Sequence, residues 1–316
     1  MNERSWLTAD AAVARAVELK IASGVLSSGT RVIDAGIDAR GGFGAGRLLA
    51  ELCMGGLGHV EYAPLTIDGE SWPGVQVWTD HPAESCMASQ YAGWAISPEG
   101  YFAMGSGPLR AKARVERELY ERLGYAEEVS QGVLVLETRT LPTDDVAAWV
   151  ATKAGVTTAG LTFAVAPTAS LAGGVQVVAR VVETSLHKME TLGFDVRRVV
   201  SATGTAPLPP IAKNDLRAIG RTNDCVLYGG QARFVVDAGD TELAELAERL
   251  PASASADYGT PFYDIFKRYD NDFYKIDPLL FSPGEVWLMS ATSGRTFHAG
   301  ALNPEVLRTS LYELEP

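Results

Sequence analysis

The sequence predicts an α+β fold with two lobes, and three observations support this prediction. Short runs of β-branched and apolar residues alternate with segments of helical period, which is typical of mixed helix and sheet. Some strand signals follow one another with only a short link, which indicates hairpins. The 316 residues, 47% of them hydrophobic, are enough for more than one core. We expect an N-terminal lobe, 1–166, and a C-terminal lobe, 167–316, and leave open whether each lobe is continuous in sequence.

The individual elements follow from hydrophobic period and capping signals. Strands are predicted at 30–36, 60–67, 74–80, 132–138 and 160–167. Helices are predicted at 8–23, 45–54, 108–124, 143–155, 170–192 and 241–250. Thr143 and Asp144 suit the start of the fourth helix, because their short side chains can accept from free backbone N–H groups. Hairpins are expected within 60–80 and within 285–300, where Ser293 and Gly294 form the turn.

The clearest predicted loop is 202–215. Pro207, Pro209 and Pro210 disfavour regular backbone hydrogen bonding in this segment. A division between the lobes at this loop is the alternative to one near residue 166. The sequence shows no internal repeat and no low-complexity linker that would decide between them.

Composition and charge narrow the class of partner. A net charge of −12 argues against nucleic acid, because binding to a phosphate backbone depends on basic patches. No apolar run reaches the roughly 18 residues that a membrane span needs, and the first residues lack the pattern of a secretion signal. Three widely spaced cysteines indicate reduced, buried thiols rather than disulfides. We therefore expect a cytoplasmic protein that acts on a small molecule.

Two glycine-rich segments precede predicted helices, where free N–H groups attract anions. Gly41, Gly42, Gly44 and Gly46 match neither the dinucleotide motif G-x-G-x-x-G nor the phosphate loop G-x-x-x-x-G-K-[ST]. A tight turn is therefore the favoured interpretation there. For 104–114, an anion site and a plain capped turn are about equally supported.

Metal and nucleophile motifs are absent from the sequence. The four histidines and three cysteines form no C-x-x-C, H-x-E or H-E-x-x-H pair, and no G-x-S-x-G elbow occurs. The segment 257–278 is rich in aromatic residues, which suits stacking on a flat ligand or, more commonly, packing against one another. The sequence thus predicts no bound metal.

A polar stripe runs along the predicted helix 170–192. Gln176, Arg180, Glu183 and His187 fall within about 60° of one another at the helical period, and apolar residues occupy the opposite side. One interpretation is a solvated face, which the pattern alone favours. The other is the lining of a cleft, because the stripe holds an acid and a base three residues apart.

Six blocks that occur in order resemble methenyltetrahydromethanopterin cyclohydrolases. They are "TDHPAESCMASQYAGW" (79–94), "YFAMGSGP" (101–108), "APTASLAGGVQVVARVVETSLHKM" (166–189), "GRTNDCVLYGG" (220–230), "DYGTPFYDIF" (257–266) and "DFYKIDPLLFSP" (272–283). The resemblance covers nearly the whole chain. It implies a two-lobed fold with the pterin in a cleft between the lobes, a cytoplasmic homotrimer, and no metal or other cofactor. It also implies a role in the one-carbon metabolism of methanogens and methylotrophic bacteria.

The resemblance assigns a role to two residues of the stripe. Glu183 matches the general base and acid of the family, which activates the water that attacks the methenyl carbon, and Arg180 matches the arginine that keeps this carboxylate ionised. Substrate-binding candidates lie in the other matching blocks; they are Asp80, His81, Gln90, Tyr91, Arg221, Asn223 and Asp224. For the six other than Tyr91, loop caps and hydrogen bonds between lobes are about equally good explanations. Gln176 and His187 receive no role.

One departure and two alternatives remain. Tyr91 stands where several archaeal relatives carry lysine, so any contact of that lysine with substrate is changed in this chain. A non-catalytic protein that binds or channels the pterin is the alternative function. A folate-type carrier is the alternative substrate, because the two carriers share the reacting ring.

Overall fold

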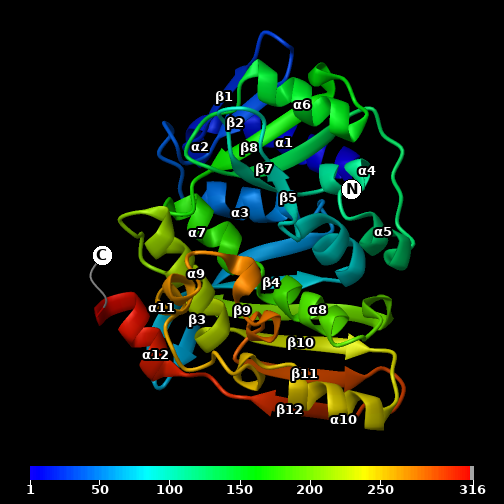
Figure 1. Cartoon of the computed structure of the whole chain (residues 1–316), viewed down its shortest axis with the longest axis vertical. Helices are drawn as coiled ribbons and strands as arrows, with labels where there is room; N and C mark the ends of the chain where they lie inside the picture. Colours follow the sequence, from blue (N-terminus) through cyan, green and yellow to red (C-terminus); the bar gives the residue numbers. More distant parts are fainter. Residues whose placement is uncertain (314–316) are drawn as a thin grey trace. The chain divides into compact units, whose positions relative to one another are not determined.

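The computed structural model describes the backbone of residues 1–313, together with their side chains except those of Tyr274 and Glu313. The chain divides into two compact units. Unit 1 comprises Met1–Gly58 and Glu84–Gln176, and unit 2 comprises His59–Ala83 and Val177–Pro316. Each unit has its own six-stranded mixed sheet with helices, which confirms the predicted α+β class (Figure 1).

This division differs from the expected one between 166 and 167. The strands β3 (Gly58–Ile67) and β4 (Glu70–Thr79) form a hairpin, and β4 pairs antiparallel with β9 (Val199–Pro207). Because these backbone hydrogen bonds join the hairpin to the second sheet, 59–83 belongs to unit 2 although it is surrounded in sequence by unit 1. The later division lies inside the helix α7 (Leu171–Val178).

Unit 1 is built on a sheet with strand order β1-β2-β8-β7-β6-β5. Its strands are β1 (Ala22–Val25), β2 (Arg31–Asp34), β5 (Trp94–Ile96), β6 (Ala103–Ser106), β7 (Gly132–Glu137) and β8 (Leu161–Ala166). Its helices are α1 (Asn2–Ala14), α2 (Ala16–Leu19), α3 (Phe43–Cys53), α4 (Leu109–Ala113), α5 (Arg117–Leu123), α6 (Asp144–Ala154) and most of α7. The central strands β2, β8 and β7 are parallel.

The core of unit 1 lies on both faces of this sheet. Val133 and Val135 of β7 pack in one cluster with residues of α1 and α3, whereas Leu134 and Leu136 pack in another with residues of α6. A strand buried on both faces needs a continuous apolar run instead of an alternating one. The sequence "GVLVLE" of β7 meets this requirement.

Unit 2 is built on a sheet with strand order β12-β11-β10-β9-β4-β3. The strands not yet introduced are β10 (Gln231–Val236), β11 (Glu285–Ser290) and β12 (Thr296–Gly300). The helices are α8 (Val181–Thr191), α9 (Asp215–Gly229), α10 (Asp240–Arg249), α11 (Phe262–Arg268) and α12 (Pro304–Arg308). Among the described strand pairs of this sheet, β10 and β11 are the parallel one, and the connection between them contains α10 and α11.

The side chains of the second sheet are buried alternately. In β10, Ala232, Phe234 and Val236 are buried, and the residues between them are partly or fully exposed. This period of two is typical of a sheet that packs helices on one face only. At Gly204 a Cβ atom would lie 2.9 Å from Val181 Cγ1, so α8 packs closely on the buried face.

The predicted hairpins and the predicted helix cap are confirmed. Asp68 and Gly69 link β3 to β4 with φ values of 52° and 76°, as two-residue hairpin turns require. β11 and β12 pair antiparallel across the turn that contains Gly294. Thr143 is the N-cap of α6 and accepts from the N–H of Val146 at 3.5 Å.

Four predicted elements were wrong in extent. The helix predicted at 8–23 is replaced by α1, α2 and the strand β1, and the one at 108–124 is divided into α4 and α5 at Arg114, whose φ is 51°. The helix at 170–192 is divided into α7 and α8. The loop at 202–215 begins only after Pro207, because β9 gains hydrogen bonds from neighbours on both sides. The prolines therefore end the strand and do not prevent it.

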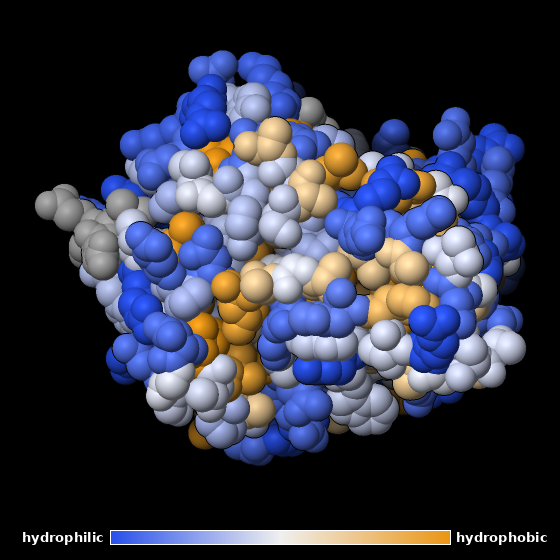
Figure 2. All heavy atoms as spheres, turned by 90° about the horizontal axis from the view of Figure 1, so that it is seen from below, coloured by the Kyte–Doolittle hydropathy of each residue, from blue (hydrophilic) through white to orange (hydrophobic). Residues whose placement is uncertain are grey.

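The surface seen in Figure 2 is mostly hydrophilic, with apolar residues gathered in patches across its middle. Cys53, Cys86 and Cys225 are buried thiols that form no disulfide among the described residues, as the sequence predicts. Within residues 1–313, no helix is both long and apolar enough to cross a membrane.

Candidate functional site

The break between α7 and α8 is the central feature of the polar stripe. The N–H of Arg180 bonds to the carbonyl of Val177 at 3.1 Å, and the carbonyl of Arg180 accepts from Thr184 at 2.9 Å. Arg180 therefore closes one helix and precedes the first residue of the next. Valines surround the break, and β-branched residues have low helix propensity. Glu183 consequently lies in the first turn of α8 and not in the middle of a long helix.

Both residues are buried, which contradicts the solvated-face interpretation. Arg180 is 8% exposed, Glu183 is 5% exposed and Gln176 is 3% exposed. His187, at the other end of the stripe, is half-buried. A buried carboxylate needs compensation, and the first turn of a helix provides some because the helix dipole is positive there. Arg180, also buried, lies three residues before Glu183 in the sequence and carries the opposite charge.

Gln176 takes part in a polar network at the carboxyl ends of the parallel strands of unit 1. Its Nε2 donates to Glu137 Oε2 at 3.2 Å, and its Oε1 lies 3.9 Å from Cys53 Sγ. The hydroxyl of Thr168 donates to the other oxygen of Glu137, and the hydroxyl of Ser106 lies 3.1 Å from Cys53 Sγ. This hydrogen bond from Gln176 orients the Glu137 carboxylate, which is a structural task for a residue that received no role from the sequence.

The sequence analysis did not single out Glu137. It ends β7, and Asp34 ends the parallel strand β2. In open α/β sheets, ligands bind at the carboxyl ends of parallel strands. The sequence signal for Glu137 was therefore a carboxylate residue directly at the end of a buried apolar strand. Asp34 has a structural task, because its carboxylate accepts from the N–H groups of four consecutive residues, 36–39, at 2.7–3.0 Å.

A π-helix over Ala83–Gln90 precedes Tyr91. Such helices are rare and are frequent at functional sites. Gln90 is fully buried, and Tyr91 lies with its ring centroid 5.0 Å from the guanidinium carbon of Arg110. Arg110 is itself fully buried, bonds to Glu116 Oε2 at 2.8 Å, and donates to the carbonyl of Ser89 at 3.3 Å. The Arg110 guanidinium therefore supports both the end of the π-helix and the ring of Tyr91.

Asp80 and His81 follow β4 and are exposed. The carboxylate of Asp80 accepts from the hydroxyl of Ser201, and the N–H of His81 donates to Thr79 Oγ1 at 3.0 Å. Ser201 and Gly204 lie in the same strand, an odd number of residues apart, so they face opposite sides of the sheet. Because α8 packs on the Gly204 side, the structure does not bring Asp80 together with Glu183.

Three further candidates lie on α9. Arg221 is buried and donates to the carbonyl of Ile211 at 3.3 Å; burial lowers its pKa, and the neighbouring Arg217 lowers it further. Asn223 is half-buried and donates through Nδ2 to the carbonyl of Ile219 at 2.8 Å. A buried guanidinium retains further donors for a ligand, because it carries five N–H groups.

Asp224 is fully buried, and protein groups occupy both of its oxygens. Oδ1 accepts from the N–H of Phe262 at 2.8 Å, at the start of α11, and Oδ2 accepts from the hydroxyl of Ser310. Burial raises the pKa of this carboxyl to about 8, against the opposing effect of the two hydrogen bonds. These contacts give Asp224 a structural task in holding α11 and the segment after α12 against α9.

Metal coordination has no evident place in these arrangements. No group of three or more His, Cys, Asp or Glu side chains suited to a metal ion occurs in the part of the chain that the structure describes.

Comparison with known proteins gives one consistent result. The family model described as Cyclohydrolase (MCH) matches residues 1–311. A methenyltetrahydromethanopterin cyclohydrolase of Methylobacillus flagellatus is 49% identical over 286 residues, 90% of this chain and 87% of that protein. Proteins of the same name from Methylobacterium organophilum and Methanosarcina barkeri are 45% and 44% identical, over 98% and 90% of this chain and 97% and 89% of their own lengths. The chain therefore belongs to the cyclohydrolase (MCH) family, and it is an enzyme of the hydrolase class.

Proposed function

We propose that the enzyme interconverts 5,10-methenyl-tetrahydromethanopterin plus water with N5-formyl-tetrahydromethanopterin. The names of the curated relatives support this reaction, since they match the chain over most of its length. One structural observation carries the assignment of residues: Arg180 and Glu183 are both buried at a helix start. Two buried side chains of opposite charge at such a position are suited to chemistry more than to solubility.

In the proposed mechanism, Glu183 acts first as a base and then as an acid. The substrate is a cation whose methenyl carbon bridges N5 and N10 and is already electrophilic, so the enzyme needs only to position and activate water. The carboxylate of Glu183 takes a proton from the attacking water, and the oxygen bonds to the methenyl carbon. Glu183 then returns this proton to N10 as the bond from carbon to N10 breaks, and the hydroxyl of the intermediate releases its proton to water, which leaves the formyl group on N5.

Arg180 favours the charged form of Glu183 in this scheme. Burial disfavours a carboxylate, and a guanidinium at the preceding turn opposes this effect. The dipole of α8 acts in the same direction as Arg180. The carboxylate also stabilises the bound substrate cation.

The remaining substrate-binding residues are proposed because they lie in sequence segments that match the family. His81, Gln90, Tyr91, Arg221 and Asn223 lie in segments that match the family, and their polar groups are of the kinds that bind the edge of a pterin ring. Asp80 accepts from Ser201, and Asp224 accepts from Phe262 and Ser310. We therefore do not include these two carboxylates among the proposed substrate-binding residues.

The rest of the proposal follows the family. The reaction needs no metal or other cofactor, because the substrate carries its own positive charge. We propose a homotrimer that works in the cytoplasm in one-carbon metabolism, which fits relatives from methylotrophic and methanogenic genera. If the protein sediments as a stable monomer, the proposal of a trimer is wrong.

A spectrophotometric assay with methenyl-tetrahydromethanopterin tests the reaction. We expect the methenyl absorbance to disappear with the wild-type protein, and Glu183→Gln to lower kcat by about 10³-fold, within the usual range for loss of a general base. Glu190→Gln is the matched control, because it makes the same change on the same helix at a half-buried position. Wild-type turnover by Glu183→Gln would show that the base is another residue.

Two results would change the function itself. Tight binding of the pterin without turnover by the wild-type protein would support the non-catalytic carrier. Faster turnover of methenyl-tetrahydrofolate than of methenyl-tetrahydromethanopterin would assign the enzyme to the folate carrier.

A further inference from the structure

The second sheet has an outer face that bears a row of aromatic and cationic side chains. We define the outer face as the side of this sheet opposite α8. The row crosses all six strands and consists of His59, Trp78, Thr203, Arg233, Trp287 and His298. Pairing between strands places Trp78 opposite Thr203, Thr203 opposite Arg233, Arg233 opposite Trp287 and Trp287 opposite His298.

Flat groups in this row stack on one another. The rings of His59 and Trp78 have centroids 4.1 Å apart with an interplanar angle of 24°, and those of Trp287 and His298 are 4.7 Å apart at 18°. The guanidinium carbon of Arg233 lies 3.9 Å from the Trp287 ring centroid. Stacking at both ends holds Trp78 and Arg233 as ordered surfaces, which lowers the entropy cost of binding.

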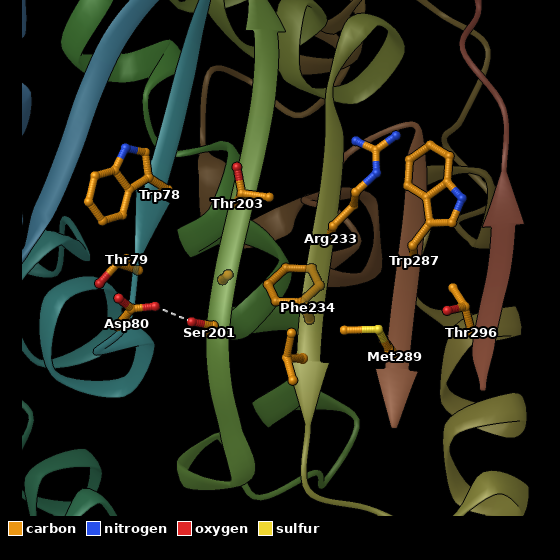
Figure 3. A pocket seen from close by; sticks show the side chains of 12 residues that line it. Trp78, Thr79, Asp80, Ser201, Thr203, Arg233, Phe234, Trp287, Met289 and Thr296 are labelled. Atoms are coloured by element: carbon orange, nitrogen blue, oxygen red, sulfur yellow. Dashed lines mark hydrogen bonds between the residues drawn. The ribbon is translucent and has the colours of Figure 1, made fainter. Parts of the chain in front are cut away.

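A groove of about 430 Å³ lies along the row (Figure 3). Trp78, Thr203, Arg233 and Trp287 line it at one level, and Asp80, Ser201, Met289 and Thr296 line it at the next. Trp78 is 40% exposed and Met289 is 39% exposed. This volume is within the usual range for sites that bind small molecules.

The short side chain of Thr203 lies between the larger side chains of Trp78 and Arg233 in the lining of the groove (Figure 3). Trp78 and Arg233 are two strands apart, which corresponds to about 10 Å at the usual strand spacing. A flat ring between two stacked groups needs about 7 Å, two contacts of about 3.5 Å each. Figure 3 shows Trp78 on one side of Thr203 and the Arg233 guanidinium on the other.

The Arg233 guanidinium gives this side of the groove a positive charge. Within the described residues, the side chain of Arg233 contacts the Trp287 ring and forms no ion pair with a carboxylate. The nearby Asp80 carboxylate is engaged by the Ser201 hydroxyl. A stacked guanidinium with available N–H donors is suited to an anionic group, and tryptophan is suited to a ring.

We propose that this outer groove binds a planar heteroaromatic ligand that carries an anionic group, with its ring between Trp78 and Arg233 and its anion on the Arg233 guanidinium. The site goes beyond the proposed function, because α8 and Glu183 lie on the other side of the sheet. A second copy of the chain is the competing occupant. A stable protein interface, however, usually buries about 800 Å² on each partner, whereas the groove has the dimensions of a small molecule.

Isothermal titration calorimetry of the full chain tests the proposal with two probes, AMP and pterin-6-carboxylate. Adenosine and inorganic phosphate are the matched controls, since each retains only one half of AMP. We expect AMP to bind at least about tenfold more tightly than either half. Arg233→Gln and Trp78→Ala change exposed residues and should each weaken AMP binding about tenfold.

Arg295→Gln is the matched protein control. Arg295 is also exposed and stacked, with its guanidinium carbon 5.5 Å from the Phe297 ring centroid, but it does not line the groove. Its substitution should leave AMP binding unchanged. The proposal is overturned if neither probe binds, or if binding survives both Arg233→Gln and Trp78→Ala. It is also overturned if these two variants change the sedimentation of the ligand-free protein while AMP does not bind, which would assign the face to a second copy.

Discussion

The buried carboxyl of Asp224 should make the stability of the enzyme fall as the pH rises through neutrality. Its pKa in the folded state is raised to about 8 by burial, whereas the ordinary value is 3.8. Between these two values the folded state holds a proton that the unfolded state has released. The unfolding free energy therefore decreases with increasing pH, by at most about 1.4 kcal/mol per pH unit.

Asp224→Asn removes the titrating carboxyl and keeps the local geometry. An asparagine oxygen can accept from the N–H of Phe262, and its amide nitrogen can donate to the hydroxyl of Ser310, which accepts instead of donating. We expect the variant to gain stability relative to wild type as the pH rises from 5 to 7, by at most about 3 kcal/mol in total.

Urea unfolding followed by circular dichroism at pH 5, 6 and 7 measures this difference. Comparing variant with wild type at each pH cancels the contributions of all other titrating groups. A difference in free energy that is constant over this range would show that Asp224 is already ionised and would refute the argument. An infrared band of a protonated carboxyl that disappears in Asp224→Asn provides a direct check at pH 7.

Two further predictions concern α8. Lys188 is fully buried, donates to the carbonyl of Pro251 at 2.7 Å, and has a pKa lowered to about 7 by burial, against the effect of Asp277. The folded state therefore binds fewer protons above pH 7, so wild-type stability gains from rising pH up to about 10.5, and urea unfolding of Lys188→Met should lack this slope. Gly204→Ala places a methyl 2.9 Å from Val181 and should cost about 1–3 kcal/mol and lower kcat by moving Glu183. Gly24→Ala is its control, because nothing lies within 4 Å, and equal losses of stability in both variants would contradict the packing argument.

The sequence predicted the elements whose signals are local. The strand β7 and the hairpin of β3 and β4 have apolar runs or turn residues that specify them without reference to the rest of the chain. The strand β9 did not have such a signal, because its hydrogen bonds come from β4 and β10, which are distant in sequence. The same reason explains why 59–83 was not assigned to unit 2.

The sequence supplied candidate residues for the site but did not predict how they are arranged in the structure. Family resemblance singled out Arg180 and Glu183, and helical period placed them on one side. Neither could locate the break at Arg180, because the competition between helix propensity and packing is decided by neighbours in space. Glu137 was missed for a related reason: its partner Gln176 is far away in sequence.

The break between α7 and α8 gives Glu183 a property that the single predicted helix would not have given it. In the middle of a helix of 23 residues, from 170 to 192, a carboxylate would lie far from either end and would gain little from the dipole, whose effect is confined to the terminal turns. In the first turn of α8 it gains this effect in a buried setting, where charges are screened least. Gly204 then lets the same turn approach the sheet closely, through Val181 and Val182. The local features that the period could not predict are thus the ones that favour a charged, fixed carboxylate at the position proposed for the base.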